Sequence, residues 1–369
     1  MAMYLFIMLT YRHWFLKLSL FKPNSMVQPA TNFTVIIPAR NEAANIGNCL
    51  SSILEQHYPT HLFEIIVIDD FSTDNTAAII EQLQVSHSNL RLIKLADIVF
   101  DKQLNSYKKK AIEIAIGQAT KDWIATTDAD CVAQPNWLAL FNNYIQQNDV
   151  VFVGSPVVFT SDGSVLQTFQ CIDFMALQGV TAASVSAGFH AMCNGANLAF
   201  KKAVFFEVDG YKNVDALASG DDMFLMNKIQ TRYPKNIGFL YHQHAVISTL
   251  PMPTISSFLN QRIRWASKTN SYKDMRIVAI LWMVLLLNIG LVIMPFLAVL
   301  QPVLLLYWLG LLAVKTFVEA LFAFNIATFF AIKLKAWYLF LQLPHLLYTA
   351  LAGCFGLFGT YQWKDRTVK

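Results

Sequence analysis

Residues 33–42 read FTVIIPARNE, a run of β-branched and aromatic side chains that ends in a polar cluster. A run of this kind, bounded by polar residues, predicts a buried strand, here over residues 33–37. A second such run covers residues 64–68, and residues 45–56 between them carry apolar side chains at helical spacing. Strand, helix and strand in this order form a βαβ unit. The sequence therefore predicts an α/β domain built on an open, twisted sheet.

The strand pattern continues along the chain, and polar residues follow each predicted strand at once. Residues 123–127 repeat the strand signal after the helical stretch 109–117. The polar sequences are PARNE at 38–42, DDFSTD at 69–74 and TDAD at 127–130. Open α/β sheets bind their ligands beyond the carboxyl ends of the strands, so we expect these clusters to line one crevice.

The TDAD cluster places Asp128 and Asp130 in a D-x-D pattern at a strand end. Carboxylate oxygens suit Mg²⁺ or Mn²⁺, and such a metal in turn binds a diphosphate. Taken alone, an aspartate here is also explained as a turn or helix-capping residue. The chain has no G-x-x-x-x-G-K-[ST] loop and no G-x-G-x-x-G after the first strand. Carboxylates and a metal would therefore have to hold any bound nucleotide.

Two later clusters also carry candidate chemistry. Adjacent acids at Asp221 and Asp222 precede a helix-like segment, and one of them could remove a proton from a hydroxyl; the alternative is helix capping. The sequence QRIRW at 261–265 lies on a segment whose apolar spacing suits a helix on a membrane surface. Its Arg264 could stabilise a departing diphosphate and its Trp265 could stack on a sugar, although both residue types are also common at membrane interfaces.

The composition places part of this chain in lipid. Charged residues make up 14% of it, against about 25% in soluble proteins, and the mean hydropathy is +0.41. A net charge of +4 is too small for a nucleic-acid-binding surface, which excludes nucleic acid as a partner. The five cysteines form no C-x-x-C pair and are expected to be reduced thiols.

The apolar residues are concentrated near the C-terminus. Residues 277–297 and 336–358 each predict a spanning helix, because about 20 apolar residues cross a bilayer. Residues 303–332 are long for one helix and short for two, so three spans are favoured over four. The positive-inside rule does not decide between these counts. Residues 1–30 predict a membrane-associated helix. This helix could lie at the membrane interface or re-enter it, could span the membrane, or could be buried in the protein. The charges of Arg12 and Lys17 argue against a cleaved signal peptide.

The chain carries five motifs in one order: VIIPARNE, VIDDxSTDxT, TDAD, GDD and QRIRW. This set, followed by apolar segments, resembles the membrane-bound branch of the family-2 inverting glycosyltransferases, which includes cellulose, chitin and hyaluronan synthases and ceramide glucosyltransferase. The resemblance covers residues 31–270. It implies an A-type glycosyltransferase fold, that is, a Rossmann-like nucleotide-diphospho-sugar transferase domain followed by a C-terminal α-helical transmembrane region.

The predicted organisation follows the same order. An N-terminal membrane-associated helix at 1–30 precedes the catalytic domain at 31–250. An interfacial amphipathic helix with QRIRW at 251–275 then leads to transmembrane helices at 276–363 and a tail at 364–369.

The resemblance also implies roles for residues of the first strand loops. Arg40 and Glu42, with Pro38 before them, would line the nucleotide-base pocket, and Asp70 would contact the uracil or ribose. Lys110 would approach the diphosphate, with Lys109 as the alternative.

The later motifs carry the remaining implied roles. Asp128 and Asp130 match the D-x-D, with Asp130 as the direct metal ligand. Gly195 and Asn197 match a loop that faces donor and acceptor. Asp222, beside Asp221, matches the catalytic base, although Glu-Asp is the commoner pair. The Q-x-x-R-W positions are Gln261, Arg264 and Trp265.

These assignments predict a membrane-bound enzyme that transfers a sugar from a nucleotide sugar, expected to be UDP-linked, to a hydroxyl of a lipid-anchored or glycan acceptor. A divalent metal, Mg²⁺ or Mn²⁺, would assist a single displacement with inversion. The alternatives are a processive polysaccharide synthase of the same family and a polytopic transporter with a regulatory α/β domain, which would use Lys315, Glu319 and His345. Membrane lipid is an expected partner. The expected location is integral to a membrane, the cytoplasmic membrane in a bacterium, with the catalytic domain facing the cytoplasm.

Overall fold

The strands expected at residues 33–37, 64–68 and 123–127 are present as β1 (Phe33–Ala39), β2 (Phe63–Asp69) and β4 (Trp123–Thr126). The computed structural model describes residues 1–99, 106–215, 217, 219–334, 336–358, 361–363 and 366–368. The chain divides into two units. The sheet unit comprises Ser19–Val158 and Ala191–Leu250, and the helical unit comprises Met1–Leu18, Phe159–His190 and Pro251–Lys369.

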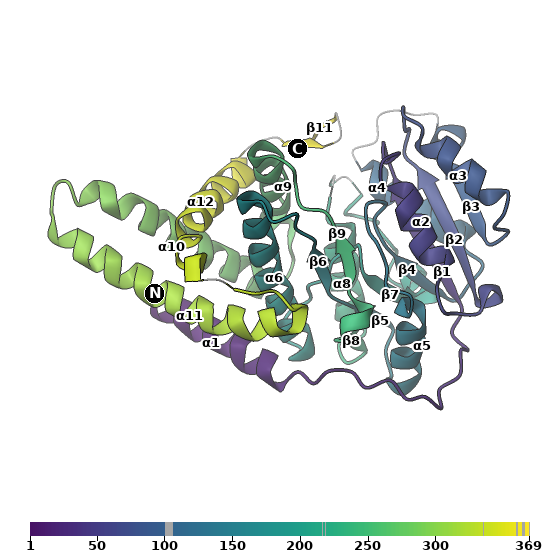
Figure 1. Cartoon of the computed structure of the whole chain (residues 1–369), viewed down its shortest axis with the longest axis horizontal. Helices are drawn as coiled ribbons and strands as arrows, with labels where there is room; N and C mark the ends of the chain where they lie inside the picture. Colours follow the sequence, from purple (N-terminus) through teal and green to yellow (C-terminus); the bar gives the residue numbers. More distant parts are fainter. Residues whose placement is uncertain are drawn as a thin grey trace. The chain divides into compact units, whose positions relative to one another are not determined.

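The sheet unit is built on a seven-stranded mixed sheet with the order β3-β2-β1-β4-β7-β5-β8 (Figure 1). The strands β3 (Leu90–Lys94), β2, β1 and β4 run parallel. The short strand β7 (Leu198–Lys201) is antiparallel to both β4 and β5 (Phe152–Gly154), and β8 (Ile237–Phe239) is parallel to β5. Almost all of β1 is buried, as expected for a parallel strand covered on both faces.

Helices connect the parallel strands. The chain runs from β1 outward to β3 through α2 (Ile46–Leu54) and α3 (Thr76–Gln84), and then returns to β4 through α4 (Tyr107–Gln118). Right-handed crossovers place the outward helices and the returning helix on opposite faces. The strand order therefore reverses between β1 and β4, which is where open α/β sheets bind ligands.

The remaining elements of the sheet unit are short. They are the helices α5 (Trp137–Gln147), α7 (Lys202–Glu207) and α8 (Asp221–Arg232), the 3₁₀ turns η1 (Thr60–Leu62), η2 (Leu95–Asp97) and η3 (Gln243–Ala245), and a two-stranded sheet of β6 (Val157–Phe159) and β9 (Ile247–Thr249).

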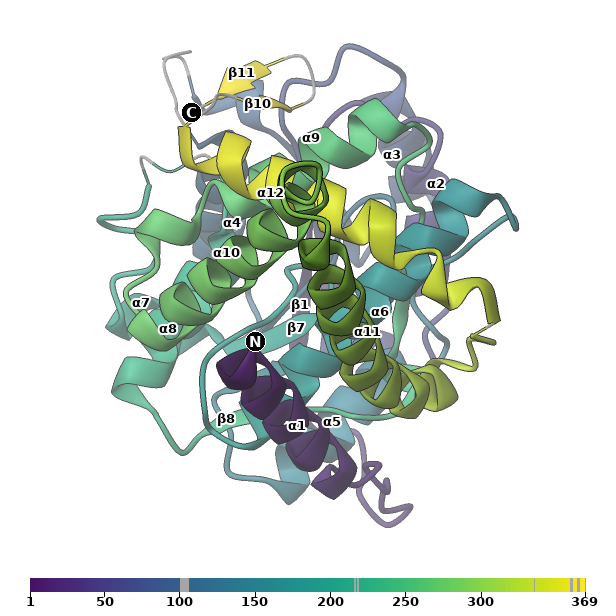
Figure 2. The ribbon, with the colours of Figure 1, turned by 90° about the vertical axis from the view of Figure 1, so that its left-hand side faces the viewer.

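The helical unit contains six α-helices within the described residues. They are α1 (Ala2–Lys17), α6 (Val165–Ser186), α9 (Ile255–Ala266), α10 (Met275–Leu297), α11 (Val303–Phe330) and α12 (Gln342–Phe358), with short elements η4 (Thr269–Ser271), η5 (Ala336–Leu339), β10 (Tyr361–Trp363) and β11 (Arg366–Val368). Helix α12 packs against α9 and α10, and α1 packs against α6 and α11 (Figure 2).

Two helices of this unit, α10 and α11, are long and apolar enough to cross a membrane. Large apolar side chains are exposed along both of them, including Leu286, Phe296, Leu306 and Phe317. Such surfaces are stable in lipid rather than in water. The stretch at 303–332, for which the sequence allowed one helix or two, is occupied by one 28-residue helix. With 17 residues, α12 is shorter than these two helices, so its crossing stays a prediction.

The structure departs from the predicted domain boundaries at two segments. The N-terminal helix ends at Lys17, and residues 19–30, predicted to belong with it, are part of the sheet unit. Residues 159–190, expected in the catalytic domain at 31–250, belong to the helical unit through α6. Gly179 of α6 allows α6 to pack closely on α11, because a Cβ at this position would lie 2.1 Å from Cδ1 of Ile326 in α11. Of the predicted tail at 364–369, residues 364, 365 and 369 lie outside the described residues.

Candidate active site

The loops that follow β1 and β2 are joined by hydrogen bonds. Nη1 of Arg40 donates to the carbonyl oxygens of Asp70, at 2.8 Å, and Phe71, at 3.1 Å. The amide of Asn41 donates to the hydroxyl of Ser72 at 2.9 Å. Both Asn41 and Phe71 adopt positive φ angles, 51° and 54°, so each loop turns sharply as it leaves its strand. The two polar clusters predicted at these strand ends therefore form one surface.

The other predicted residues of these loops are Pro38, Glu42 and Asp70. Pro38 lies within β1, opposite Ile68 of β2. The carboxylate of Glu42 accepts a hydrogen bond from Nδ2 of Asn45, at the start of α2. The side chain of Asp70 is buried, and its amide donates to the carbonyl of Ala39. The structure therefore places all these residues at the carboxyl ends of β1 and β2, as predicted from their positions after the strands.

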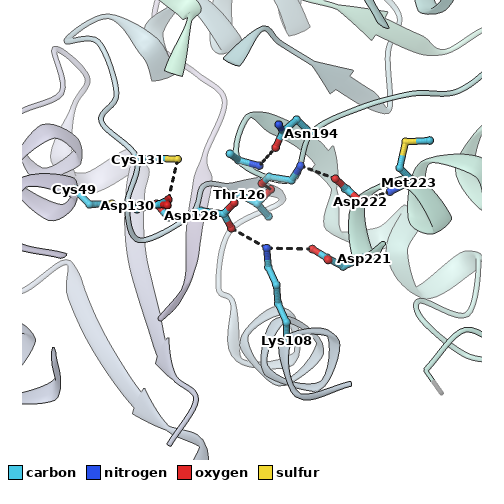
Figure 3. A network of polar contacts seen from close by, with 12 residues as sticks. Cys49, Lys108, Thr126, Asp128, Asp130, Cys131, Asn194, Asp221, Asp222 and Met223 are labelled. Atoms are coloured by element: carbon cyan, nitrogen blue, oxygen red, sulfur yellow. Dashed lines mark hydrogen bonds and ion pairs between the residues drawn. The ribbon is translucent and has the colours of Figure 1, made fainter. Parts of the chain in front are cut away.

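A lysine lies between two carboxylates beside these loops. Figure 3 shows the ammonium group of Lys108 between Asp128 and Asp221. Its Nζ is 2.7 Å from Oδ1 of Asp128 and 3.7 Å from Oδ2 of Asp221. Burial alone would lower the pKa of Lys108, but the charges of Asp128 and Asp221 outweigh this effect and raise it well above its ordinary value. The lysine is therefore a cation held between Asp128, which follows β4, and Asp221 of α8.

The predicted diphosphate ligand, Lys110, is not part of this cluster. It pairs with Glu113 at 2.9 Å on an exposed face of α4. The alternative, Lys109, is buried and donates to the carbonyl oxygens of Val214, Leu217 and Ser219.

Helical periodicity explains why Lys110 is not the lysine at the acids. Lys108 lies three and four residues before the buried Ala111 and Ile112, whereas Lys110 lies at the same spacing from the half-buried Glu113 and Ile114. The sequence reasoning missed Lys108, because three consecutive lysines have the same charge and nearly the same position. The apolar pattern that follows separates Lys110 from the other two lysines, and only the packing of α4 separates Lys108 from Lys109.

Two buried thiols donate hydrogen bonds to oxygen atoms of the D-x-D segment. Sγ of Cys131 is 3.6 Å from Oδ1 of Asp130, and Sγ of Cys49 is 3.5 Å from the carbonyl oxygen of Asp128. Burial and the charges of the two aspartates raise the pKa of both thiols, which keeps them protonated and able to donate. All five cysteines are free thiols, as predicted.

The D-x-D carboxylates have the position and the ligand chemistry of a cation site. A cation, the Lys108 ammonium, already lies against Asp128, and the nearby side-chain acceptors are carboxylate oxygens, the ligands that Mg²⁺ and Mn²⁺ prefer. Within the described part of the chain, no group of three or more His, Cys, Asp or Glu side chains could hold a metal ion. A metal at Asp128 and Asp130 would therefore need further oxygens from a diphosphate and water.

The proposed base, Asp222, lies in the first turn of α8 beside a glycine loop. Its Oδ2 accepts a hydrogen bond of 2.9 Å from the amide of Gly195, and its Oδ1 accepts one of 2.7 Å from the amide of Met223. The helix begins after Gly220, whose φ of 83° requires glycine. These two amides hold the side chain of Asp222 in one orientation. Asp222 and Asp221 are therefore first-turn residues of a helix as well as members of the acidic cluster.

The two predicted residues of the loop before β7 have different surroundings. Gly195 contacts the acids directly, because a Cβ there would lie 3.4 Å from Oδ2 of Asp221 and 3.5 Å from Cβ of Asp222. Asn197 is fully buried and bonded to protein groups on both ends of its amide. Its Nδ2 donates to the carbonyls of Pro156 and Ala245, and its Oδ1 accepts from Trp137. The structure thus corrects the prediction that Asn197 faces donor and acceptor, since its side chain is fully buried and both ends of its amide bond to the protein.

The Q-x-x-R-W residues lie on α9 in the helical unit. Thr254 and Ser257 form a capping box at the start of this helix. Gln261, Arg264 and Trp265 follow on it, and the ring of Trp265 contacts that of Phe174 in α6 at a centroid distance of 5.9 Å.

Two family profiles match the chain. Glycosyl transferase family 2 matches residues 34–205, and Glycosyl transferase family group 2 matches residues 123–352, which is more than half of the chain. The chain is a family-2 glycosyltransferase. The family predicted from the five ordered motifs is thereby confirmed, and so is the prediction of an enzyme that transfers glycosyl groups.

Relatives of this glycosyltransferase include archaeal and bacterial enzymes. Glycosyltransferase AglE of Haloferax volcanii is 28% identical over 234 residues, which are 63% of this chain and 70% of AglE. The poly-β-1,6-N-acetyl-D-glucosamine synthase of Staphylococcus aureus is 27% identical over 248 residues, 66% of this chain and 56% of the synthase. The alignment thus spans little more than half of the synthase.

The fold of the glycosyltransferase is shared with a solved structure. The mannosyltransferase PcManGT from Pyrobaculum calidifontis, in complex with GDP-Man and Mn²⁺, superposes with a TM-score of 0.53 at 17% identity, over 96% of each chain. The predicted A-type glycosyltransferase fold with apolar C-terminal helices is therefore confirmed.

Proposed function

We propose that this family-2 glycosyltransferase is membrane-bound and transfers a sugar from a nucleotide sugar, UDP-linked, to a hydroxyl of a lipid-anchored or glycan acceptor, with inversion at the anomeric carbon. The observation that carries the proposal is the cluster formed by Lys108, Asp128, Asp221 and Asp222 at the carboxyl end of the sheet. A diphosphate needs cations, and an attacking hydroxyl needs a base; this cluster offers both kinds of group.

The proposed reaction is a single displacement. Asp222 accepts the proton of the acceptor hydroxyl, whose oxygen forms the new bond to the anomeric carbon. The bond from that carbon to the diphosphate oxygen breaks, and the nucleoside diphosphate leaves with the electron pair. No enzyme nucleophile is required, so the configuration inverts. Lys108 would hold the diphosphate, and Arg264 and Trp265 keep the roles implied by their motif, charge stabilisation and stacking on the sugar.

A divalent cation fits this proposal at Asp130 and Asp128. When bound, Mg²⁺ or Mn²⁺ would neutralise the charge of the diphosphate leaving group. Its remaining ligands would be diphosphate and water oxygens, in keeping with the pair of protein carboxylates present. A mannosyltransferase of similar fold was solved with GDP-Man and Mn²⁺, and GDP-Man therefore belongs among the donors to be tested.

The membrane location is also a proposal. The apolar helices α10 and α11 support integral insertion, with lipid as a partner and the catalytic domain on the cytoplasmic side, where nucleotide sugars are supplied. Because the chain belongs to a family of glycosyltransferases, we do not retain the transporter alternative. Processive synthesis remains the second candidate, favoured by the similarity to the poly-β-1,6-N-acetyl-D-glucosamine synthase.

A donor screen tests the proposed function. Full-length protein in detergent or nanodiscs is incubated with UDP- and GDP-sugars, with and without Mn²⁺, and donor hydrolysis, thermal stabilisation and labelled product are measured. We expect one UDP-sugar to stabilise the protein and to be consumed only with metal. A product of one added sugar supports single transfer, and a long polymer supports the processive alternative. Well-folded protein that binds no nucleotide sugar contradicts the proposal.

Replacement of Lys108 by methionine tests its role at the diphosphate. The donor KM is expected to rise by about 10- to 100-fold, because a hydrogen bond between charged groups contributes about 1.5–3 kcal/mol. Without donor, the same variant is expected to bind Mn²⁺ more tightly, since the ammonium beside Asp128 no longer competes. Steady-state kinetics and calorimetry measure the two effects.

The matched control is Lys110→Met, which removes only an exposed pair with Glu113. It should change the donor KM by less than about twofold. An equal effect of both substitutions would show that general basicity, rather than the position of Lys108, accounts for donor binding.

A further inference from the structure

A buried ion pair lies directly beside the Q-x-x-R-W residues. Nη2 of Arg262 in α9 is 2.8 Å from Oδ2 of Asp173 in α6, and the two side chains are only 3% and 4% exposed. Both belong to the helical unit. In the sequence, Asp173 belongs to no motif and stands alone in a largely apolar helix.

Helix α12 completes the surroundings of Asp173. The hydroxyl of Tyr348 donates to Oδ1 of Asp173, and Nε2 of His345 lies 3.7 Å from the same oxygen. The carboxylate thus joins three helices, α6, α9 and α12, at one point.

Aromatic rings enclose the other member of the pair. The guanidinium carbon of Arg262 lies 4.3 Å from the ring centroid of Trp265, 4.9 Å from that of Phe258 and 5.9 Å from that of Tyr348. A guanidinium stacked on a ring restrains the plane of that ring. The ring restrained most closely belongs to Trp265, the last residue of the motif. The ion pair therefore acts on the orientation of a proposed active-site side chain.

The end of α9 is held by a second contact. A Cβ on Gly356 of α12 would lie 2.6 Å from Cβ and 2.9 Å from the carbonyl carbon of Ala266, the residue after Trp265. Only a glycine allows the backbone of α12 to approach so closely. The segment from Gln261 to Trp265 is thus fixed by an ion pair on one side and by backbone contact at its end.

A buried ion pair is costly to desolvate, and an apolar pair of similar volume often stabilises a fold equally well. Its presence beside the motif is better explained by the specific geometry it imposes. We propose that Asp173 is a positioning residue for glycosyl transfer, which acts through Arg262 to orient Trp265 and the adjoining Arg264. This inference rests on the proposed function, in which those two residues contact the leaving diphosphate and the sugar.

Three variants separate positioning from simple stability. Asp173→Asn and Arg262→Gln each leave one buried charge without its partner, so both are expected to lower Tm. The double variant has no unpaired charge, and its Tm should return close to that of the wild type. Its kcat should remain about 10- to 100-fold low, since small misplacement of catalytic groups has effects of this size, while the donor KM changes less than about threefold.

A second buried pair supplies the matched control. Lys315 and Glu319 in α11 lie 2.6 Å apart, and Lys315 also donates to Gln342 of α12. Neutralising both, by Lys315→Met with Glu319→Gln, removes a buried ion pair of the same unit whose members lie on α11 rather than on α6 or α9. Nζ of Lys315 lies 3.5 Å from Nδ1 of His345, and the control leaves His345 unchanged. This control should keep kcat within about threefold of the wild type.

Hydrogen exchange of residues 255–266 gives a readout that does not depend on activity. The Asp173→Asn/Arg262→Gln variant is expected to exchange at least about threefold faster there, with unchanged exchange in the sheet unit. Recovery of kcat together with Tm in the double variant, or unchanged exchange in α9, would overturn the inference. Wild-type protein that transfers no sugar while α9 still loosens in the variant would instead count against the proposed function.

Discussion

Replacement of Asp222 by asparagine is expected to lower kcat by about 10³-fold, because general base catalysis contributes roughly 10²- to 10⁴-fold. Asparagine keeps the shape of the side chain, and its carbonyl oxygen can still accept the hydrogen bond from the amide of Gly195. Donor binding should therefore remain within about threefold of the wild type. Single-turnover transfer and donor titration on the same preparation measure the two quantities.

The control for this substitution is Asp97→Asn, the same chemical change at an exposed aspartate in η2 of the sheet unit. It should leave kcat unchanged within about twofold, as surface substitutions usually do. The variant Asp221→Asn adds a further comparison, since Asp221 faces Lys108 and should affect donor KM more than kcat. Substantial turnover by the Asp222 variant would exclude it as the base.

Removal of divalent metal is the second change with a large expected effect. Chelation by EDTA should reduce kcat/KM by about 10³-fold, because charge stabilisation by a metal is worth several kcal/mol in the transition state. Mn²⁺ or Mg²⁺ should restore the rate, and Asp130→Asn should prevent this restoration at ordinary metal concentrations. The measurement is the initial rate across a titration of each metal.

Asp149→Asn serves as the control for the metal experiment, because Asp149 is exposed and its carboxylate only accepts a hydrogen bond from Asn236. Its metal dependence should match that of the wild type. Full turnover in EDTA would contradict the role given to Asp128 and Asp130. Lys108 would then be the principal cation for the leaving diphosphate, a result that the Lys108→Met variant would reveal.

The lysines of α4 differ in a way that their sequence does not reveal. Their charge and their position near a nucleotide-binding loop can be read from the sequence. Which of the three reaches Asp128 and Asp221 depends on how α4 packs on the sheet, and Lys108 rather than Lys110 does so. The same limit applies to Asn197, whose motif suggested a ligand contact and whose amide instead bonds to the chain around it.

The sequence by itself determined the family, the first βαβ unit, the order of the strand-end acids and the presence of long apolar helices. These features depend on local side-chain pattern and spacing, which residues close in the chain carry. Only the tertiary structure decided that residues 159–190 leave the sheet unit, that Lys108 is the cation among the acids, and that Asp173 pairs with Arg262. Each of these depends on contacts between segments twenty or more residues apart. Among several side chains of the same type, the one that takes part is the one that the fold buries next to a group of opposite charge.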